Sequence, residues 1–357
     1  MAKAAIVREL NAPVEIVDVT IGEPGPGQVK IKTVAAGVCH SDVSIQNGTI
    51  PWMFPALLGH EGAGIVSAVG DGVTTPKVGD HVIFNWVPYC GNCPACDRGE
   101  TWLCNNGYAT GIIPAMMEGG MAFPMAGTGT FSEEAVVHHS AAITIPSDIP
   151  MDIAALVGCG VTTGVGAAIN TAKVEPGSTV LVIGCGGVGM NVIQGARICG
   201  ASYIVAMDRF ENKAAEALRF GATHATTPEG LDELKASLTG GEGFDYAFEV
   251  IGLSTTIRAA FDNARKGGTT VVVGVGRADD NVSFSGLEFL LKEPKILGCV
   301  YGSSHVATDY IRFLNLWKAG RLDLEGLISK HISIEDVPAA FESMERGEVI
   351  RSVISFD

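Results

Sequence analysis

The sequence is short of positive charge. Its 357 residues include 24 Lys and Arg against 39 Asp and Glu, which gives a formal net charge of −15. Because nucleic-acid phosphates and anionic lipid surfaces repel such a chain, we expect no nucleic acid and no membrane among its partners. Charged residues make up only 18% of the chain and hydrophobic residues 47%. This composition excludes a disordered polymer and predicts a globular protein.

We also expect no targeting segment, and this sets an expectation about location. Residues 1–9 become charged before an apolar signal core can form. We expect no run of the roughly 18 uncharged apolar residues that a membrane-spanning helix requires. The expected location is the cytoplasm. The nine cysteines are not expected to pair as disulfides in that reducing compartment, so clustered ones are better explained as metal ligands.

What is present points to two domains, the default expectation for a chain of this length. The segment to about residue 155 is expected to be mostly β, because short strand patterns at 3–7, 28–36, 62–69 and 81–84 are separated by Gly/Pro turns. Strand and helix patterns then alternate, which predicts βαβ units on a parallel sheet. The strands are expected at 178–183, 203–207, 244–250 and 269–275, and the helices at 187–199, 211–220 and 255–264. The tail is expected to hold helices at 307–318 and 339–344 and a strand at 349–356.

A glycine-rich loop follows directly on one of these strands. The residues Gly184-Cys185-Gly186-Gly187-Val188-Gly189 match G-x-G-x-x-G and open a helix pattern. Gly184 permits the tight turn, Gly186 lets the backbone approach a pyrophosphate, and Gly189 lets the helix pack closely on the strand. The free N–H groups at the helix start attract phosphate. The context predicts a dinucleotide-binding site.

Asp208 stands at the end of the second strand of this region, 19 residues after Gly189. A carboxylate there accepts hydrogen bonds from a ribose 2′-hydroxyl and repels a 2′-phosphate, so it favours NAD over NADP. The alternative is that Asp208 caps the next helix. The adjacent Arg209 could soften the preference for NAD.

Four cysteines lie within 15 residues, at Cys90, Cys93, Cys96 and Cys104. Four thiolates in a turn-rich loop can surround a tetrahedral zinc ion and leave no position vacant, which describes a structural site. An iron–sulfur centre and chance clustering are the alternatives. The spacing predicts structural zinc.

A second set, Cys39, His60 and Cys159, is scattered along the chain. Taken singly, each is explained as well by an ordinary core cysteine or a hydrogen-bonded histidine. Cys39 and His60 follow strand-like or turn-like runs, where side chains can converge. Three protein ligands with a fourth position open are what a catalytic zinc requires.

Together these motifs resemble the zinc-dependent medium-chain alcohol dehydrogenases, from the first strands to the closing residues 351–356. The resemblance implies an α/β protein in which a Rossmann domain with a doubly wound parallel sheet joins a mostly β, GroES-like catalytic domain. The NAD-binding domain is expected at 161–300, and the catalytic domain at 1–160 and 301–357.

By this resemblance, Cys39, His60 and Cys159 are the ligands of the catalytic zinc, and the four-cysteine loop holds a second zinc. A cysteine at position 159 is not expected in the polyol branch of the superfamily. Asp42 would fix the tautomer of His60, and Glu61 would lie behind the metal. Ser41 would take the proton of the alcohol, and His40 is a further catalytic candidate. Solvated turn acids are the alternative for Asp42 and Glu61.

The resemblance also implies contacts with the cofactor, and it shows one departure. The contacts are His40, Thr163, Gly184, Gly186, Gly187, Val188, Gly189, Asp208, Arg209, Lys213, Val273, Val275 and Arg351. Ordinary surface charges are the alternative for His40, Lys213 and Arg351, and a helix start for Thr163. Well-known members carry a histidine three residues after the relay hydroxyl, where this chain has Ser44. Water or Ser44 would then finish the proton relay.

The implied function is hydride transfer between a primary, possibly aromatic, alcohol and NAD. The candidate pocket residues are Ile50, Trp86, Met125 and Ala126, for which core packing is the alternative. The rival enzyme is a thiol-dependent formaldehyde dehydrogenase, and a non-catalytic NAD-binding protein is a further alternative. The long segment between Cys104 and Phe131 is typical of the dimeric branch, so the expected partners are a small alcohol or aldehyde and a second copy of the chain.

Overall fold

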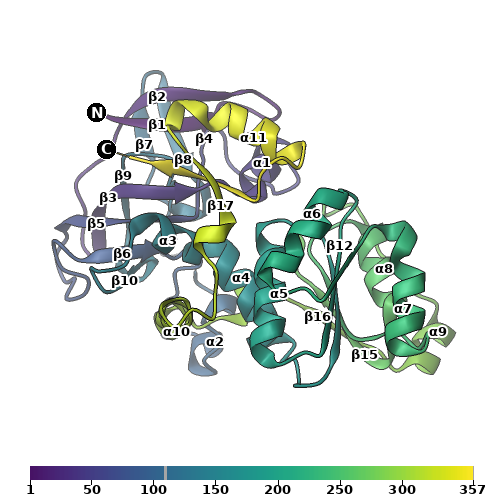
Figure 1. The fold of residues 1–357 in the computed structure, drawn as a ribbon. Helices are drawn as coiled ribbons and strands as arrows, with labels where there is room; N and C mark the ends of the chain where they lie inside the picture. The colour runs from purple at the N-terminus through teal and green to yellow at the C-terminus, as the bar shows by residue number, and fades with distance from the viewer. Residues whose placement is uncertain (108–110, 357) are drawn as a thin grey trace. The chain divides into compact units, whose positions relative to one another are not determined.

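The computed structural model describes residues 1–107 and 111–356, and its chain divides into two compact units. Unit 1 contains residues 1–160 and 305–357, and unit 2 contains residues 161–304. The expected α/β architecture, with one mostly β part and one Rossmann part, is confirmed (Figure 1). Each unit has its own sheets and is described separately.

Unit 1 is built on two mostly antiparallel sheet systems, each of which contains a parallel strand pair. A closed barrel contains β1 (Ala2–Val7), β2 (Val14–Thr20), β7 (Ala115–Met117), β8 (Gly120–Pro124) and β4 (Ala56–Leu57). The second sheet has the order β10 (Ala142–Thr144), β6 (His81–Phe84), β5 (Gly62–Val69), β3 (Gln28–Gly37), β18 (Arg351–Ser355) and β17 (Ile328–Ile332), with β9 (Glu134–His138) also pairing with β3. Pairing of the C-terminal β18 with β3 in antiparallel register places residue 353 opposite residue 37. The C-terminal segment therefore completes the sheet from which the first metal candidate, at residue 39, emerges.

The helices of unit 1 are short or lie at its surface. They are α1 (His40–Gln46), α2 (Pro94–Asp97), α3 (Met151–Leu156), α10 (Val306–Lys318) and α11 (Val337–Glu345). α10 is tied to the sheet because the buried Tyr310 hydroxyl donates to the carbonyl of Phe84 at 3.1 Å and to that of Gly158 at 3.4 Å.

Unit 2 is a six-stranded, all-parallel sheet. Its order is β13 (His224–Thr226), β12 (Tyr203–Met207), β11 (Thr179–Ile183), β14 (Phe244–Glu249), β15 (Ala264–Val272) and β16 (Lys295–Gly298). In Figure 1, α5 (Gly187–Cys199) and α6 (Glu211–Glu216) cover one face, and α7 (Leu231–Thr239), α8 (Ser254–Asn263) and α9 (Gly286–Lys292) cover the other. Chain order reverses between β11 and β14, so the carboxyl ends of these strands form the crevice where open α/β sheets bind ligands.

Several expected elements need correction. The expected helix 211–220 is α6 followed by a 3-10 turn, Ala217–Phe220, and the expected strand 269–275 ends at Val272. Val273 and Gly274 instead donate their N–H groups to the carbonyl of Glu249. Of the segment between Cys104 and Phe131, residues 108–110 lie outside the described residues.

The expectation that no long apolar run exists was wrong. Met151–Thr171 is a continuous helical segment of 21 residues, long and apolar enough to cross a membrane by length and composition alone, and it includes α3 and α4 (Thr162–Gly166). In the structure, 83% of its most apolar window is buried inside the protein, as in a core helix.

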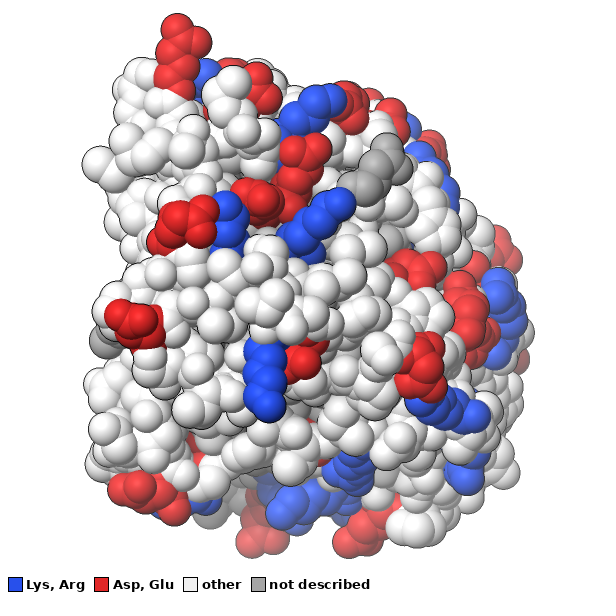
Figure 2. Space-filling model, turned by 90° about the vertical axis from the view of Figure 1, so that its left-hand side faces the viewer, with Lys and Arg blue, Asp and Glu red and all other residues white. Residues whose placement is uncertain are grey.

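Charge on the surface is mixed. Figure 2 shows acidic and basic side chains interspersed on a mostly uncharged face, with no large gathering of basic side chains in that view. Exposed acidic and basic side chains of the described residues also form ion pairs, such as Lys3–Glu335 and Lys318–Asp148. The expectation about nucleic acid stays a prediction.

Candidate metal centres and cofactor loop

Four buried side chains of unit 1 meet although they come from distant parts of the sequence. Cys39 immediately precedes α1, His60 and Glu61 immediately precede β5, and Cys159 lies in a π-helical turn, Val157–Val161. One donor atom from each lies within 4.8 Å of the others. The structure thus brings together the three scattered residues of the sequence analysis, and the Glu61 carboxylate, which was expected behind the metal, lies beside them.

Asp42 fixes two of these residues in place. Its Oδ2 accepts the N–H of Cys39 at 2.9 Å, and its Oδ1 accepts the N–H of Gly59 at 3.1 Å. Oδ1 also lies 3.4 Å from Nδ1 of His60. Asp42 is fully buried, so the alternative of a solvated turn acid is wrong. One carboxylate therefore closes the start of α1 and orients the imidazole.

The donor set fits a zinc ion. Both ring nitrogens of His60 are buried, and neither has a hydrogen-bond partner among the described residues. Burial opposes a positive charge there, but the Asp42 carboxylate raises the pKa of His60 to about 10. A metal ion at the same place would take the role of the proton. Two sulfurs and one imidazole nitrogen are the ligand types that zinc prefers.

The buried side chains of Glu61 and Arg351 lie beside this group of donors and form an ion pair. Arg351 Nη2 lies 3.6 Å from Glu61 Oε2, and Nη1 donates to the carbonyl of Val38 at 2.9 Å. Burial raises the pKa of Glu61 to about 7 although the guanidinium works against the shift. Both side chains are buried, so neither is an ordinary surface charge.

Gly160 leaves room for the guanidinium of Arg351. A Cβ at Gly160 would approach Arg351 Nη2 to 2.4 Å, so only glycine fits beside Cys159 without displacing the guanidinium.

The four-cysteine loop forms a second group in unit 1. One sulfur from each of Cys90, Cys93, Cys96 and Cys104 lies within 4.8 Å of the others, with Cys104 Sγ at 3.6 Å from Cys90 Sγ and 3.9 Å from Cys93 Sγ. A tetrahedron of sulfurs around zinc at about 2.3 Å has edges of about 3.8 Å, whereas a disulfide bond is about 2.0 Å long. The loop has the dimensions of a zinc site.

Local backbone geometry builds this second group. Cys93 precedes α2, whose first residue is Pro94, and the N–H of Cys90 donates to Cys104 Sγ at 3.3 Å. The pKa of Cys93 is lowered to about 6, first by the N–H of Cys96, while burial raises the pKa of Cys104 to about 12. N–H groups directed at sulfur stabilise thiolates before any metal arrives.

The proposed relay residues lie on α1. Ser41 Oγ is 3.7 Å from Cys39 Sγ and is partly exposed. Ser44 lies one turn further along the helix and is buried, and His40 is exposed at the helix start. Positions i and i+3 share a helix face, so the two hydroxyl groups are neighbours on α1.

The four pocket candidates gather in one apolar cluster of unit 1. Met125 and Ala126 are buried in it, and Ile50 and Trp86 pack against it, as do Trp52 and Phe54, which the sequence analysis did not single out. The Trp86 ring stands edge-on to the His60 ring, with centroids 6.2 Å apart and planes at 86°. The cluster therefore reaches the first metal group through Trp86.

The glycine loop of unit 2 follows β11 and opens α5. A Cβ at Gly189 would lie 1.9 Å from the carbonyl oxygen of Gly184, so this close packing requires glycine. The N–H of Cys185 donates to Asp208 Oδ2 at 2.8 Å, and that of Phe210 donates to Oδ1 at 2.9 Å. The residue that precedes α6 is Phe210 and not Asp208, so the alternative of Asp208 as a helix cap is wrong. Asp208 is instead joined to the loop.

The other expected cofactor residues also lie in unit 2, apart from His40 and Arg351. Val273 and Val275 follow β15. Thr163 is the second residue of α4, inside a continuous helical segment, so it does not start a helix. Lys213 lies in α6 and is partly exposed.

Sequence reasoning missed Glu249, the fully buried last residue of β14. Its Oε1 accepts N–H groups from Ile251 and Gly252 and the hydroxyl of Thr256. An acid at the carboxyl end of a strand expected in the parallel sheet was the available signal.

Comparisons with known proteins agree with the α/β fold and indicate a family. A family model described as "Alcohol dehydrogenase GroES-like domain" matches residues 25–147, and one described as "Zinc-binding dehydrogenase" matches residues 187–316. The NDMA-dependent alcohol dehydrogenase of Amycolatopsis methanolica is 37% identical over 99% of this chain and 98% of its own. The S-(hydroxymethyl)glutathione dehydrogenase of Paracoccus denitrificans is 35% identical over 99% of both. The crystal structure of benzyl alcohol dehydrogenase from Acinetobacter calcoaceticus covers 100% of this chain and 99% of its own, with a TM-score of 0.92 and 28% identity.

Proposed function

We propose, given that the chain belongs to the zinc-dependent medium-chain alcohol dehydrogenases, that it transfers hydride between a primary alcohol and NAD. Membership makes the chain an oxidoreductase, so the alternative of a non-catalytic binding protein is set aside. The observation that carries the proposal is the buried meeting of Cys39, His60 and Cys159, with the hydroxyl of Ser41 beside it.

In this proposal Cys39, Cys159 and Nε2 of His60 hold the catalytic zinc, and the four-cysteine loop holds the structural one. When bound, the catalytic zinc supplies a Lewis acid that lowers the pKa of an alcohol oxygen. Nδ1 of His60 faces Asp42, which leaves Nε2 for the metal. The buried pair of Glu61 and Arg351 lies behind the donors and excludes water from that side.

Ser41 accepts the proton of the alcohol. Its hydroxyl lies next to Cys39 Sγ and is partly exposed, so it reaches both a substrate oxygen and solvent. Ser44 is buried on the same face of α1 and has no imidazole to carry the proton outward. Water therefore completes the relay from Ser41.

At the cofactor end, the glycine loop and the first N–H groups of α5 bind the pyrophosphate. Asp208 is held by two backbone N–H groups, and its remaining lone pairs accept the ribose hydroxyls. Its negative charge favours the unphosphorylated ribose of NAD. Val273 and Val275 supply backbone groups for the nicotinamide end.

The apolar cluster around Trp86 selects the alcohol. The Trp86 ring narrows the approach to His60, and Ile50, Met125 and Ala126 line the same cluster. A narrow, flat opening favours primary and aromatic alcohols over branched secondary ones. Steady-state rates test this: benzyl alcohol is expected to exceed cyclohexanol in kcat/KM, and the reverse order would contradict the proposed pocket.

One alternative activity has support from a relative. The Paracoccus relative is named for S-(hydroxymethyl)glutathione, the adduct of formaldehyde and a thiol. A panel of alcohols and aldehydes with NAD, with and without glutathione, separates the two activities. Primary-alcohol oxidation without thiol supports the proposed function, whereas formaldehyde oxidation only with thiol supports the alternative.

We also propose that the partner is a second copy of the chain, bound through one edge of unit 2. α9 turns Leu287, Leu290 and Leu291 outward, each 65–70% exposed, at the spacing of one helix face. Exposed apolar patches larger than a few hundred Å² are rare on monomers. β16, which follows α9, is the last strand of the sheet and has a free edge among the described strands. Two such edges can pair about a two-fold axis.

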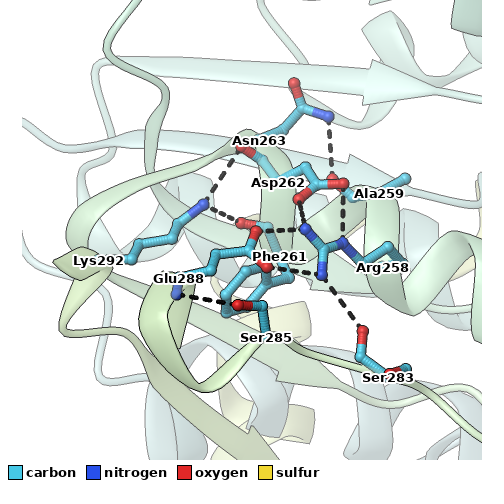
Figure 3. A network of polar contacts seen from close by, with 9 residues as sticks. All are labelled: Arg258, Ala259, Phe261, Asp262, Asn263, Ser283, Ser285, Glu288 and Lys292. Atoms are coloured by element: carbon cyan, nitrogen blue, oxygen red, sulfur yellow. Dashed lines mark hydrogen bonds and ion pairs between the residues drawn. The ribbon is translucent and has the colours of Figure 1, made fainter. Parts of the chain in front are cut away.

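A polar network keeps this helix in place (Figure 3). Arg258 of α8 binds Glu288 and Asp262, and Lys292 donates to the carbonyl of Phe261, so the charged face of α9 is turned inward against α8. Light scattering is expected to give a dimer, and Leu290→Glu is expected to give monomers with the fold retained. A monomeric wild-type chain would contradict the proposed interface.

A further inference from the structure

Glu249 is a fully buried acid at the carboxyl end of β14, next to the point where chain order in the sheet reverses. Its Oε1 accepts the N–H of Ile251 at 2.9 Å, the N–H of Gly252 at 2.7 Å and the hydroxyl of Thr256 at 2.7 Å. Burial raises the pKa of Glu249, while these donors lower it. Three donors directed at one oxygen of a buried acid fix the turn that follows β14, residues 250–253.

The main chain of Glu249 holds a second turn, residues 273–276, which follows β15. The Glu249 carbonyl accepts the N–H of Val273 at 2.8 Å and that of Gly274 at 3.1 Å. This turn is the segment expected to meet the nicotinamide end of the cofactor. One residue therefore binds the turns after two neighbouring strands, the first with its carboxylate and the second with its carbonyl.

The two turns also pack on each other through their backbones. A Cβ at Gly252 would lie 2.4 Å from the carbonyl carbon of Val275, and a Cβ at Gly274 would lie 2.2 Å from the amide nitrogen of Gly252. Gly252 also has a φ of 95°, a left-handed conformation that glycine adopts at low cost. Tightly packed backbone transmits a displacement, because it cannot yield as a flexible side chain does. A shift of the turn after β14 would therefore move the turn after β15.

The glycine loop has anchors of its own. The N–H of Gly184 donates to the carbonyl of Met207 at 2.8 Å, and the N–H of Cys185 donates to Asp208 Oδ2 at 2.8 Å. Both acceptors lie at the end of β12, and neither bond involves Glu249. The pyrophosphate end and the nicotinamide end of the expected cofactor site thus have different supports.

We propose that Glu249 is a positioning residue for hydride transfer, because its carboxylate sets the turn after β14 and that turn sets the backbone at the nicotinamide end. The inference rests on the proposed NAD site and adds a residue that acts on it through the backbone. Glu249 does not touch the cofactor itself. Its effect is concentrated at the nicotinamide end, where a small misplacement of the ring relative to the alcohol lowers the rate strongly.

Equilibrium binding to the full-length protein separates the two ends of the cofactor. NADH, followed by its fluorescence, spans both ends, whereas ADP, followed by calorimetry, contains only the adenosine and pyrophosphate part. Glu249→Ala is expected to raise the Kd of NADH about tenfold, the value of one charge-assisted hydrogen bond, and that of ADP less than about twofold. At saturating NAD, kcat is expected to fall about tenfold, because the nicotinamide ring is held less well against the alcohol.

Three further variants separate positioning from stability. Glu249→Gln retains an oxygen that accepts the same donors, so it is expected to recover most of the NADH affinity and of kcat. Thr256→Val removes one donor with little change in shape and is expected to weaken NADH binding about threefold. Asp245 is the matched control, because it lies near the amino end of the same strand and accepts the N–H and the hydroxyl of Thr179. Asp245→Asn is expected to lower the unfolding midpoint and to leave the ratio of the two Kd values unchanged.

The possible failures are distinct. If Glu249→Ala weakens NADH and ADP equally, or changes neither, the positioning role is wrong and the NAD site stands. If that variant does not fold, Thr256→Val decides, and an unchanged ratio of the two Kd values there would overturn the proposal. If the wild-type chain binds neither nucleotide, the proposed NAD site itself fails.

Discussion

The two cysteine-rich groups of unit 1 differ in how the chain builds them. The four-cysteine loop takes all its donors from residues 90–104 and is partly exposed, whereas the Cys39 group takes its donors from residues 39–159 and is fully buried. The first is surrounded by backbone N–H groups and the second by Asp42, Glu61 and Arg351. A local group of four sulfurs suits a closed structural site, and a buried set of three donors with a hydroxyl nearby suits chemistry.

Removal of one donor from the buried group is expected to have the largest effect on activity. Cys159→Ala is expected to lower kcat by at least about 10³-fold and to reduce bound zinc from two ions per chain to one, because three ligands become two. Steady-state rates and metal analysis by atomic emission measure both effects. Cys199→Ala, at the end of α5 and outside both groups, is the control. Full activity with two zinc ions in Cys159→Ala would remove the basis of the distinction.

Ser41 marks the buried group as the reactive one. Ser41→Ala is expected to lower kcat about 10²-fold without loss of zinc, since a positioned proton acceptor contributes about that factor or more. Ser41→Thr is expected to recover most of the rate because it restores the hydroxyl. If Ser41→Ala lost zinc in proportion to its activity, the side chain would be supporting the site rather than accepting a proton.

Substitution of Asp42 tests whether the carboxylate next to His60 strengthens zinc binding. Asp42→Asn is expected to weaken zinc binding by about 10- to 100-fold, the usual cost of losing a carboxylate that orients a liganding histidine. Competition with a chromogenic chelator gives the affinity. Asp97→Asn, an exposed acid in the first turn of α2 beside the other group, is the matched control, and its affinity is expected to stay unchanged. Equal losses in both variants would contradict a specific role for Asp42.

The smallest effect on rate is expected in the four-cysteine loop. Cys93→Ser is expected to change kcat less than about threefold but to destabilise unit 1 by about 3 kcal/mol, a typical severe loss for a damaged structural metal site. For a unit of this size, that corresponds to an unfolding midpoint lower by roughly 6–12 °C. Thermal unfolding followed by circular dichroism provides the measurement. A large drop in kcat at unchanged stability would make the loop catalytic.

The same contrast explains what the sequence could predict. The four-cysteine group, the glycine loop and the strands around them follow from spacing and period, because their determinants are local. The meeting of Cys39, His60 and Cys159 depends on pairing of β3 with β5 and β18, which no local pattern contains. Burial of Arg351 against Glu61 depends on the same long-range strand pairing, so the sequence pattern alone could not predict it.

Other details were decided by packing rather than by pattern. The expected strand 269–275 ends at Val272 because the backbone of Val273 and Gly274 turns to the Glu249 carbonyl. The helical segment Met151–Thr171 contains π-helical turns, which shift the spacing of its apolar residues. A pattern of 3.6 residues per turn therefore did not predict this segment. Helix α9 was not predicted because its outward face is apolar, whereas a surface helix usually has a polar outward face.

Anomalous diffraction at the zinc edge from crystals of the full chain is the most direct test of the account. We predict two peaks per chain, one inside the four-cysteine loop and one about 2.3 Å from the sulfurs of Cys39 and Cys159 and about 2.0 Å from Nε2 of His60, with a fourth ligand that is not protein. A single peak in the loop, or a second peak that lies away from either sulfur, would contradict it.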